Sequence, residues 1–160
     1  MDRLWAPWRI KYVQSKKTGG CLFCRASRAS GARGRVVFRT AGSICMLNIF
    51  PYNNGHLMVA PLRHTGTLER LGDAETLDLF RAVKRAQKLL DGVLQPHGYN
   101  IGLNIGSAAG AGIPSHVHVH VVPRWRGDTN FMPVAGSTKV ISQSLDELYR
   151  RLLHAEKNTP

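Results

Sequence analysis

Alternation of apolar and polar residues is clearest over residues 116–122, which read His-Val-His-Val-His-Val-Val. This period of two is typical of a half-buried strand, and here imidazoles occupy the side that solvent-facing residues normally take. Val117, Val119 and Val121 are therefore expected to face the core, with the histidines on the opposite side. Because proline has no N–H for the ladder, the strand is expected to end at Pro123.

Apolar runs between turn signals predict four more strands, which cover Arg35–Phe38, Ser43–Ile49, His56–Ala60 and Tyr99–Ile105. The glycine- and alanine-rich segment 106–115 is expected to be a loop that leads into the histidine strand. Residues 1–35 read as a loop-rich arm, in which Trp5 and Trp8 are expected to anchor onto a core or a partner subunit.

Two amphipathic helices are also predicted. Between Ala74 and Leu94 apolar residues recur at near-helical spacing, and Asp73 is the expected N-cap. The apolar positions that define this helix are Leu77, Phe80, Val83, Leu90 and Leu94. A closing helix over Ser144–Leu153 has a serine in N-cap position. Strands in a meander with one long helix inserted indicate the α+β class, in which helices cover one face of an antiparallel sheet.

Length and composition fit one soluble domain. A chain of 160 residues with 43% apolar and 20% charged residues is ordinary for a globular protein with a single core. We expect one domain over residues 1–160, with a helix and tail in residues 142–160. The chain has no apolar run long enough to cross a membrane, and its N-terminus lacks the apolar segment of a signal peptide. A cytoplasmic protein is therefore expected.

The net charge of +12 is the unusual bulk property. A basic surface can attract nucleic acid, an anionic membrane or a polyanionic small substrate. Aromatic residues are not interleaved with the basic ones, as stacking platforms for bases require. The cations of the long helix recur at the spacing of a solvated face: Arg81, Lys84, Arg85 and Lys88. Attraction of a polyphosphate is therefore expected, and specific nucleic-acid binding is not.

The histidine strand continues into Pro-Arg-Trp-x-Gly-Asp-x-Asn-Phe-Met-Pro at residues 123–133, and Leu-Trp-Ala-Pro-Trp-Arg stands at residues 4–9. In these motifs the chain resembles the histidine triad (HIT) superfamily of nucleotide hydrolases and transferases. It is similar to the bacterial branch that includes diadenosine polyphosphate hydrolases and diadenosine tetraphosphate phosphorylases. The resemblance implies a HIT-like fold, with a five-stranded antiparallel half-barrel sheet, one long and one C-terminal helix, and a homodimer.

His118, the central histidine, is the expected nucleophile. The resemblance implies that it attacks the α-phosphorus of a nucleotide and forms a covalent nucleotidyl-histidine. A neutral imidazole is a competent nucleophile near pH 7 without an added base. The resemblance gives supporting catalytic roles to His120 and to His56, which lies in Asn-Asn-Gly-His-Leu-Met-Val at residues 53–59. A satisfied structural histidine is the alternative for His56.

Candidate substrate-binding residues flank these histidines. The resemblance places Asn48 at the ribose and Asn104 at the phosphates, although Asn48 could instead cap a turn at its strand end. Trp125 is expected to stack on a purine, with packing at the core edge as the alternative. The loop before the histidine strand contains Ser107, Gly110 and Gly112. Its backbone N–H groups can contact phosphate because glycine allows close approach, and Ser107 offers a hydroxyl.

Cys21 and Cys24 have the spacing of half a zinc site. By themselves they could also be turn-borne cysteines or a redox pair. The resemblance to zinc-bearing relatives adds His64 and His116 and implies a structural zinc held by these four residues. A zinc-bound His116 is neutral and cannot protonate a leaving group, which favours a dinucleoside polyphosphate over a phosphoramidate. Cys45 lies in an apolar strand and is expected to be a buried small hydrophobe.

These features together predict an enzyme that cleaves dinucleoside polyphosphates, above all diadenosine tetraphosphate, through nucleotidyl-His118. Water or inorganic phosphate can be the acceptor. Many relatives carry Gln or Ser beside the last loop glycine, where this chain has Ala111. Because this side-chain donor to a phosphate group is missing, the choice between water and inorganic phosphate as acceptor stays open. The alternatives are a nucleoside phosphoramidase or other nucleotidyl transferase, a nucleotide-binding module with vestigial catalysis, and a zinc-stabilised nucleic-acid-binding domain.

Overall fold

The computed structural model describes residues 20–29, 34–129, 141 and 143–158 of the chain. Trp5 and Trp8, for which we expect an anchoring role, lie outside the described residues, as do motif residues 130–133. Within the described part of the chain, no helix has both the length and the apolar character that crossing a membrane requires.

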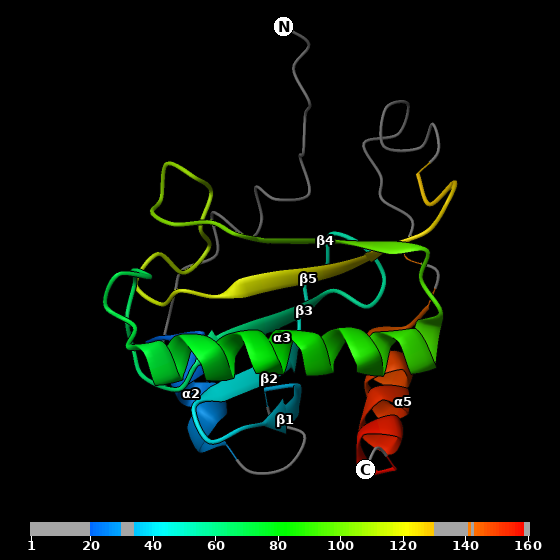
Figure 1. Ribbon diagram of the computed structural model, residues 1–160. Helices are drawn as coiled ribbons and strands as arrows, with labels where there is room; N and C mark the ends of the chain where they lie inside the picture. Colours follow the sequence, from blue (N-terminus) through cyan, green and yellow to red (C-terminus); the bar gives the residue numbers. More distant parts are fainter. Residues whose placement is uncertain (1–19, 30–33, 130–140, 142, 159–160) are drawn as a thin grey trace, which may run out of the picture.

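The strands form one antiparallel, five-stranded sheet. In chain order they are β1 (Val36–Arg39), β2 (Ser43–Leu47), β3 (Leu57–Pro61), β4 (Gly98–Leu103) and β5 (Val119–Arg124). Their order across the sheet is β1-β2-β3-β5-β4, so the sheet is open and its edges are β1 and β4 (Figure 1). The α+β class and the five-stranded antiparallel sheet expected from the sequence are confirmed.

The long helix α3 (Asp73–Leu94) and the C-terminal helix α5 (Leu145–Lys157) cover one face of the sheet (Figure 1). Their apolar sides form the main core with the strand residues Leu57, Val59, Val119 and Val121. As expected, Ser144 caps α5, because its side-chain oxygen accepts the backbone N–H of Glu147.

The core-facing side of α3 differs in part from the predicted one: Val83, Leu90 and Leu94 belong to the core as expected, whereas two positions do not. Leu77 and Phe80 are 52% and 49% exposed. The buried positions of the helix are Leu79, Ala82, Val83, Ala86, Leu89 and Leu90. Two of these buried residues, Ala82 and Ala86, are small and give a weak apolar signal. The larger side chains of Leu77 and Phe80 therefore shifted the predicted face toward solvent. The N-cap is also displaced by one residue: Gly72 takes that position, Asp73 is helical, and the Glu75 carboxylate accepts the Gly72 N–H.

A further helix, α2 (Leu22–Arg28), lies in the arm that we expected to be loop-rich. Its 7 residues are too few for periodicity to reveal it, and such a short helix is not stable by itself. Phe23 and Ala26 lie about one turn apart and are buried on the sheet face away from α3. They pack there with Ile44, Met46, Met58 and Ala60. Tertiary packing therefore holds this helix in place.

The strand that carries the histidines begins later than predicted. β5 starts at Val119, so His116 and His118 lie in the segment that enters it. This segment contacts the end of β3 and the chain beyond it: the His116 side chain bonds the carbonyl of Pro61, the last residue of β3, and the Val117 N–H donates to the carbonyl of Thr65. Side-chain and loop contacts thus replace ladder pairing at the first two histidines.

Pro123 does not end this strand, contrary to expectation, and pairs instead with Tyr99 of β4. β3 pairs with β5 only as far as Val121. Residue 123 therefore does not have to donate a backbone N–H to β3, and a proline is tolerated at this position. The carbonyl of Pro123 is used as well, since it accepts a hydrogen bond from the side chain of Asn53.

The register of α3 predicts unequal effects of two neighbouring truncations. Leu79→Ala should lower the free energy of unfolding by about 2–5 kcal/mol, because Leu79 is fully buried in the main core. Leu77→Ala should change it by less than about 0.5 kcal/mol, because half of that side chain is in solvent. Urea unfolding measures both values, and equal losses would contradict this orientation of the helix.

Candidate functional site

The histidine rings gather on the sheet face opposite α3. His120 lies on β5 beside Met58 of β3, while its neighbours on the strand point into the main core. The ring centroid of His120 lies 4.8 Å from that of His118 and 5.0 Å from that of His56. The ring of Phe23, from α2, lies 4.9 Å from that of His118. The structure thus brings His56, His118 and His120, the predicted catalytic residues, into one row.

His118 is held in one orientation and one protonation form. Its Nδ1 lies 2.8 Å from the backbone oxygen of His116. Because a carbonyl can only accept, Nδ1 carries the proton and Nε2 carries the lone pair. Burial of the ring lowers the pKa of His118 below the usual value for histidine, so the ring is neutral near pH 7. A neutral imidazole with an unprotonated Nε2 is the form that a nitrogen nucleophile needs.

A chain of hydrogen bonds also fixes the proton positions on His56 and His120. The backbone N–H of Tyr52 donates to Nδ1 of His56 at 3.0 Å, so this nitrogen is an acceptor. The proton of a neutral His56 is then on Nε2, which lies 2.9 Å from Nδ1 of His120. His120 therefore accepts at Nδ1 and carries its own proton on Nε2. Such an N–H can donate to a phosphate oxygen.

Tyr52 is a site residue that the sequence analysis did not identify. Its ring centroid lies 4.7 Å from that of His56 and 5.4 Å from that of His120, so the tyrosine covers both imidazoles. The segment 51–55 shows only a turn signal in the sequence, because proline, asparagine and glycine dominate it. The contact with the histidines depends on how this turn folds back, which no local pattern specifies.

Asn48 is buried and follows directly after β2. Its Nδ2 lies 3.2 Å from Nδ1 of His56, and its Oδ1 accepts the backbone N–H of Phe50 at 2.9 Å. Asn48 thus makes the turn-capping contact that we considered as an alternative and also touches the histidine row. Its contact with a ribose stays a prediction.

The other predicted substrate-binding residues lie along two loops. Asn104 directly follows β4, whose last residue, Leu103, pairs with Val119 at the start of β5, so it shares the His118 end of the sheet. The loop that follows contains Ser107, Gly110 and Gly112 and leads to the histidines. Within this loop the Gly110 N–H donates to the Ser107 carbonyl. Contact of these residues with phosphate stays a prediction.

Trp125 directly follows β5, at the end opposite to His118, and is half-buried. At ~3.3 Å per residue, it lies about 16 Å along the chain from His120. Trp125 thus lies away from the histidine row, and stacking of a base on it stays a prediction.

A second cluster adjoins the row, made of the four residues predicted to bind metal: Cys21, Cys24, His64 and His116. Their ligand atoms all lie within 4.8 Å of one another. Nδ1 of His116 lies 3.2 Å from Sγ of Cys21 and 3.2 Å from Nδ1 of His64. The same His64 nitrogen lies 3.3 Å from Sγ of Cys24. Atoms that share a tetrahedral zinc ion lie about 3.3–3.8 Å apart, given bonds of ~2.0–2.3 Å. The cluster has the size of such a site.

The proton positions in this cluster also suit a metal. Nε2 of His116 lies 2.8 Å from the carbonyl oxygen of Pro61, so it carries the proton and Nδ1 carries the lone pair. That lone pair points toward Cys21, Cys24 and His64, and a cation would satisfy all four donors at once. The bond to the Pro61 carbonyl is the outer contact that orients a metal-binding imidazole. Cys45 lies apart from the cluster and is fully buried, as expected.

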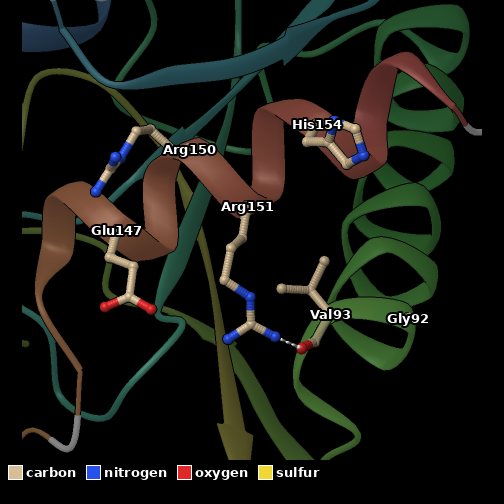
Figure 2. A pocket seen from close by; sticks show the side chains of 6 residues that line it. All are labelled: Gly92, Val93, Glu147, Arg150, Arg151 and His154. Atoms are coloured by element: carbon tan, nitrogen blue, oxygen red, sulfur yellow. Dashed lines mark hydrogen bonds between the residues drawn. The ribbon is translucent and has the colours of Figure 1, made fainter.

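A cavity of about 470 Å³ lies between the end of α3 and α5 (Figure 2). It is lined by Gly92, Val93, Glu147, Arg150, Arg151 and His154. The Arg151 guanidinium donates to the carbonyl of Val93 near the last turn of α3, as Figure 2 shows. Because both helices cover the sheet face opposite the histidines, this cavity is separate from the candidate site. Arg151 satisfies a helix-end carbonyl there.

The fold of this chain is shared with known proteins. A sequence model of the HIT domain matches residues 30–127. The chain is 41% identical to a protein of Mycobacterium tuberculosis named AP-4-A phosphorylase, over 98% of this chain and 84% of that one. The chain belongs to the HIT domain family.

Other relatives are more distant. The bis(5′-nucleosyl)-tetraphosphatase (asymmetrical) of Schizosaccharomyces pombe is 37% identical over 59% of this chain and 51% of that protein. Among solved structures, a Zn-bound histidine triad family protein from Mycobacterium smegmatis superposes with a TM-score of 0.68 and 26% identity, covering 87% of this chain and 94% of that one. A HIT family hydrolase from Legionella pneumophila gives 0.55 and 29%, over 69% and 96% of the two chains.

The cluster predicts tetrahedral metal binding through thiolates. Metal-free protein loaded with Co²⁺ should show the intense visible absorption of a tetrahedral cobalt–thiolate site, at about one ion per chain. Cys24→Ser should weaken the absorption and the metal affinity, since Sγ of Cys24 is among the converging donors. Cys45→Ala is the matched control and should bind metal normally. Absence of a thiolate signal in the parent protein would contradict the site.

Proposed function

We propose that this protein cleaves dinucleoside polyphosphates, with diadenosine tetraphosphate as the expected substrate, by moving a nucleotidyl group through His118. The observation that carries the proposal is the His118 ring, neutral and oriented by the His116 carbonyl so that Nε2 has the lone pair. The 41% identity to a protein named AP-4-A phosphorylase over 98% of the chain supports the substrate class. Inorganic phosphate is accordingly the favoured acceptor, and water is the second.

The reaction then has two displacements. In the first, Nε2 of His118 forms a bond to the α-phosphorus, and the bond from that phosphorus to the bridging oxygen breaks. The nucleoside triphosphate leaves with the electron pair of that bond. In the second, an oxygen of inorganic phosphate attacks the same phosphorus, the P–N bond breaks, and its electron pair returns to His118. The products are one nucleoside diphosphate and one nucleoside triphosphate.

His120 contributes as a hydrogen-bond donor in this proposal. Its Nε2–H, fixed by His56, can stabilise the charge that builds up on phosphate oxygens in each transition state. No proton has to be given to the leaving group, because a triphosphate leaves readily as an anion. A phosphoramidate would need that proton, and His116, with Nε2 bonded to the Pro61 carbonyl and Nδ1 turned to the cysteines, does not supply it. This chemistry favours the polyphosphate.

Zinc is the metal we propose for the cluster of Cys21, Cys24, His64 and His116. Two thiolates and two imidazoles are a donor set typical of structural zinc, and a structural neighbour at 26% identity is described as Zn-bound. When bound, zinc would supply a structural link between α2 and the segment before β5, without a step in the reaction. A cytoplasmic location is part of this proposal, because a thiolate site needs reduced cysteines.

A homodimer through β4 is the third part of the proposal. The edge strand β1 is covered, because Tyr149 of α5 donates to the carbonyl of Val36 at 2.7 Å. β4 is the other edge, and Asn100, Ile101 and Gly102 on it are exposed. A strand of this kind, without lysine or proline, is suited to pair with an identical strand. Pairing would place the apolar side chain of Ile101, 41% exposed in one chain, in the contact between two subunits.

Product analysis tests the reaction. With diadenosine tetraphosphate and inorganic phosphate, the protein should yield ADP and ATP in equal amounts, and ADP should fail to appear when phosphate is left out. His118→Ala should lose on the order of 10⁴-fold in kcat, because the nucleophile is absent. His154→Ala, an exposed histidine on α5, is the control and should be fully active. AMP formed without phosphate would indicate water as acceptor, and turnover by His118→Ala would refute the mechanism.

Sedimentation or light scattering tests the dimer. The parent chain should have twice the mass of one subunit, and Ile101→Lys should shift it toward the monomer, because a charge would be buried where the strands meet. Leu68→Lys, at another exposed apolar position, should leave the mass unchanged. A monomeric parent protein would contradict the proposal.

A further inference from the structure

A carboxylate beyond the end of β5, that of Asp128, has no part in the proposed reaction. The side chain of Asp128 is only 8% exposed and faces Arg124 in a two-point ion pair, with distances of 2.6 and 2.8 Å. The Trp125 N–H also donates to this carboxylate, at 3.1 Å. A further donor comes from another part of the chain: Nδ2 of Asn53 lies 2.8 Å from Oδ2 of Asp128. These contacts hold the pKa of Asp128 well below its usual range, Arg124 contributing most.

Asn53 lies in the turn that precedes His56. Its side chain is buried, and Nδ2 donates both to Asp128 and to the carbonyl of Pro123, at 3.1 Å. Its backbone oxygen accepts the N–H of His56. The same turn packs closely on β5: a Cβ added at Gly55 would stand 2.9 Å from Cγ of Pro123. The turn is therefore fastened to the end of β5 by two hydrogen bonds and by close packing.

This attachment bears on the proton positions in the histidine row. Nδ1 of His56 faces two donors, the Tyr52 N–H and Nδ2 of Asn48, and the Tyr52 contact requires the turn to keep its present shape. Relaxation of the turn would remove the Tyr52 donor and weaken the hold on this tautomer. With the proton on Nδ1, Nε2 of His56 would turn a lone pair toward Nδ1 of His120. His120 would in that case lose its fixed N–H donor.

We propose that Asp128 and Asn53 form a clamp that fixes the tautomers of His56 and His120, so that His120 presents an N–H to the substrate. Both are positioning residues, since they act through the turn and not by contact with the reacting atoms. The inference rests on the proposed function for the role of His120 in turnover, whereas the proton positions themselves do not depend on the substrate. If the ion pair of Asp128 were purely structural, its substitution would lower the stability of the fold without changing the tautomers of His56 and His120.

Nitrogen NMR of the histidine rings tests the clamp directly. In the parent protein at neutral pH, the two ring nitrogens of His120 should give widely separated signals, with the proton on Nε2, and His56 should show the same form. In Asp128→Asn and in Asn53→Ser, each pair of signals should move together, because the two tautomers exchange. Glu156→Gln is the matched control: this carboxylate also pairs with an arginine, Arg85, but between α3 and α5. Its spectrum should equal that of the parent.

Kinetics gives the second measurement. Both clamp variants should lose about 10- to 100-fold in kcat with little change in KM, because a donor is misplaced while the binding surface stays intact. The double variant should lose no more than the worse single one, since the two residues act as one unit. Fixed tautomers in folded Asn53→Ser, or unchanged kcat, would overturn the proposal, and so would failure of both variants to fold. A parent protein with fixed tautomers but no polyphosphate cleavage would refute the proposed function alone.

Discussion

The candidate site depends on one residue with two roles, His116. Its side chain converges with two cysteines and His64, and its backbone carbonyl holds the proton of His118. The same ring is held from the other side by the Pro61 carbonyl at the end of β3. Any displacement of His116 would therefore move the metal cluster and the proposed nucleophile together. The candidate metal cluster and the proposed nucleophile are therefore coupled through one residue.

The sheet separates two environments that this arrangement requires. On one face α3 and α5 bury the main apolar core, which fixes the strands. On the other face the small cluster around Phe23 lies beside the histidines, where it removes water from one side of His118. Low polarity on that side favours the neutral imidazole of His118. The net charge of +12 favours the approach of an anionic substrate.

Positioning of the row is distributed over segments far apart in sequence. His56 is oriented by the turn that contains Tyr52 and Asn53, and that turn is tied to the chain beyond β5 by Asp128. The motif after the triad thus has a structural purpose near the histidines even where it does not touch the substrate. Trp125, in the same segment, lies at the far end of β5 from His118.

The sequence by itself determined the class of the fold, the alternating histidines and the Cys21–Cys24 pair, because period-two patterning and ligand spacing are local signals. The resemblance to zinc-bearing relatives added His64 and His116, and the tertiary structure brings the four side chains together. Tertiary structure alone decided the burial of Phe23 in α2, the exposure of Leu77 and Phe80, and the passage of β5 through Pro123. Each of these depends on which surface comes to lie opposite a residue. The proton positions on the histidines have the same origin, since the carbonyl and N–H groups that set them come from other segments of the chain.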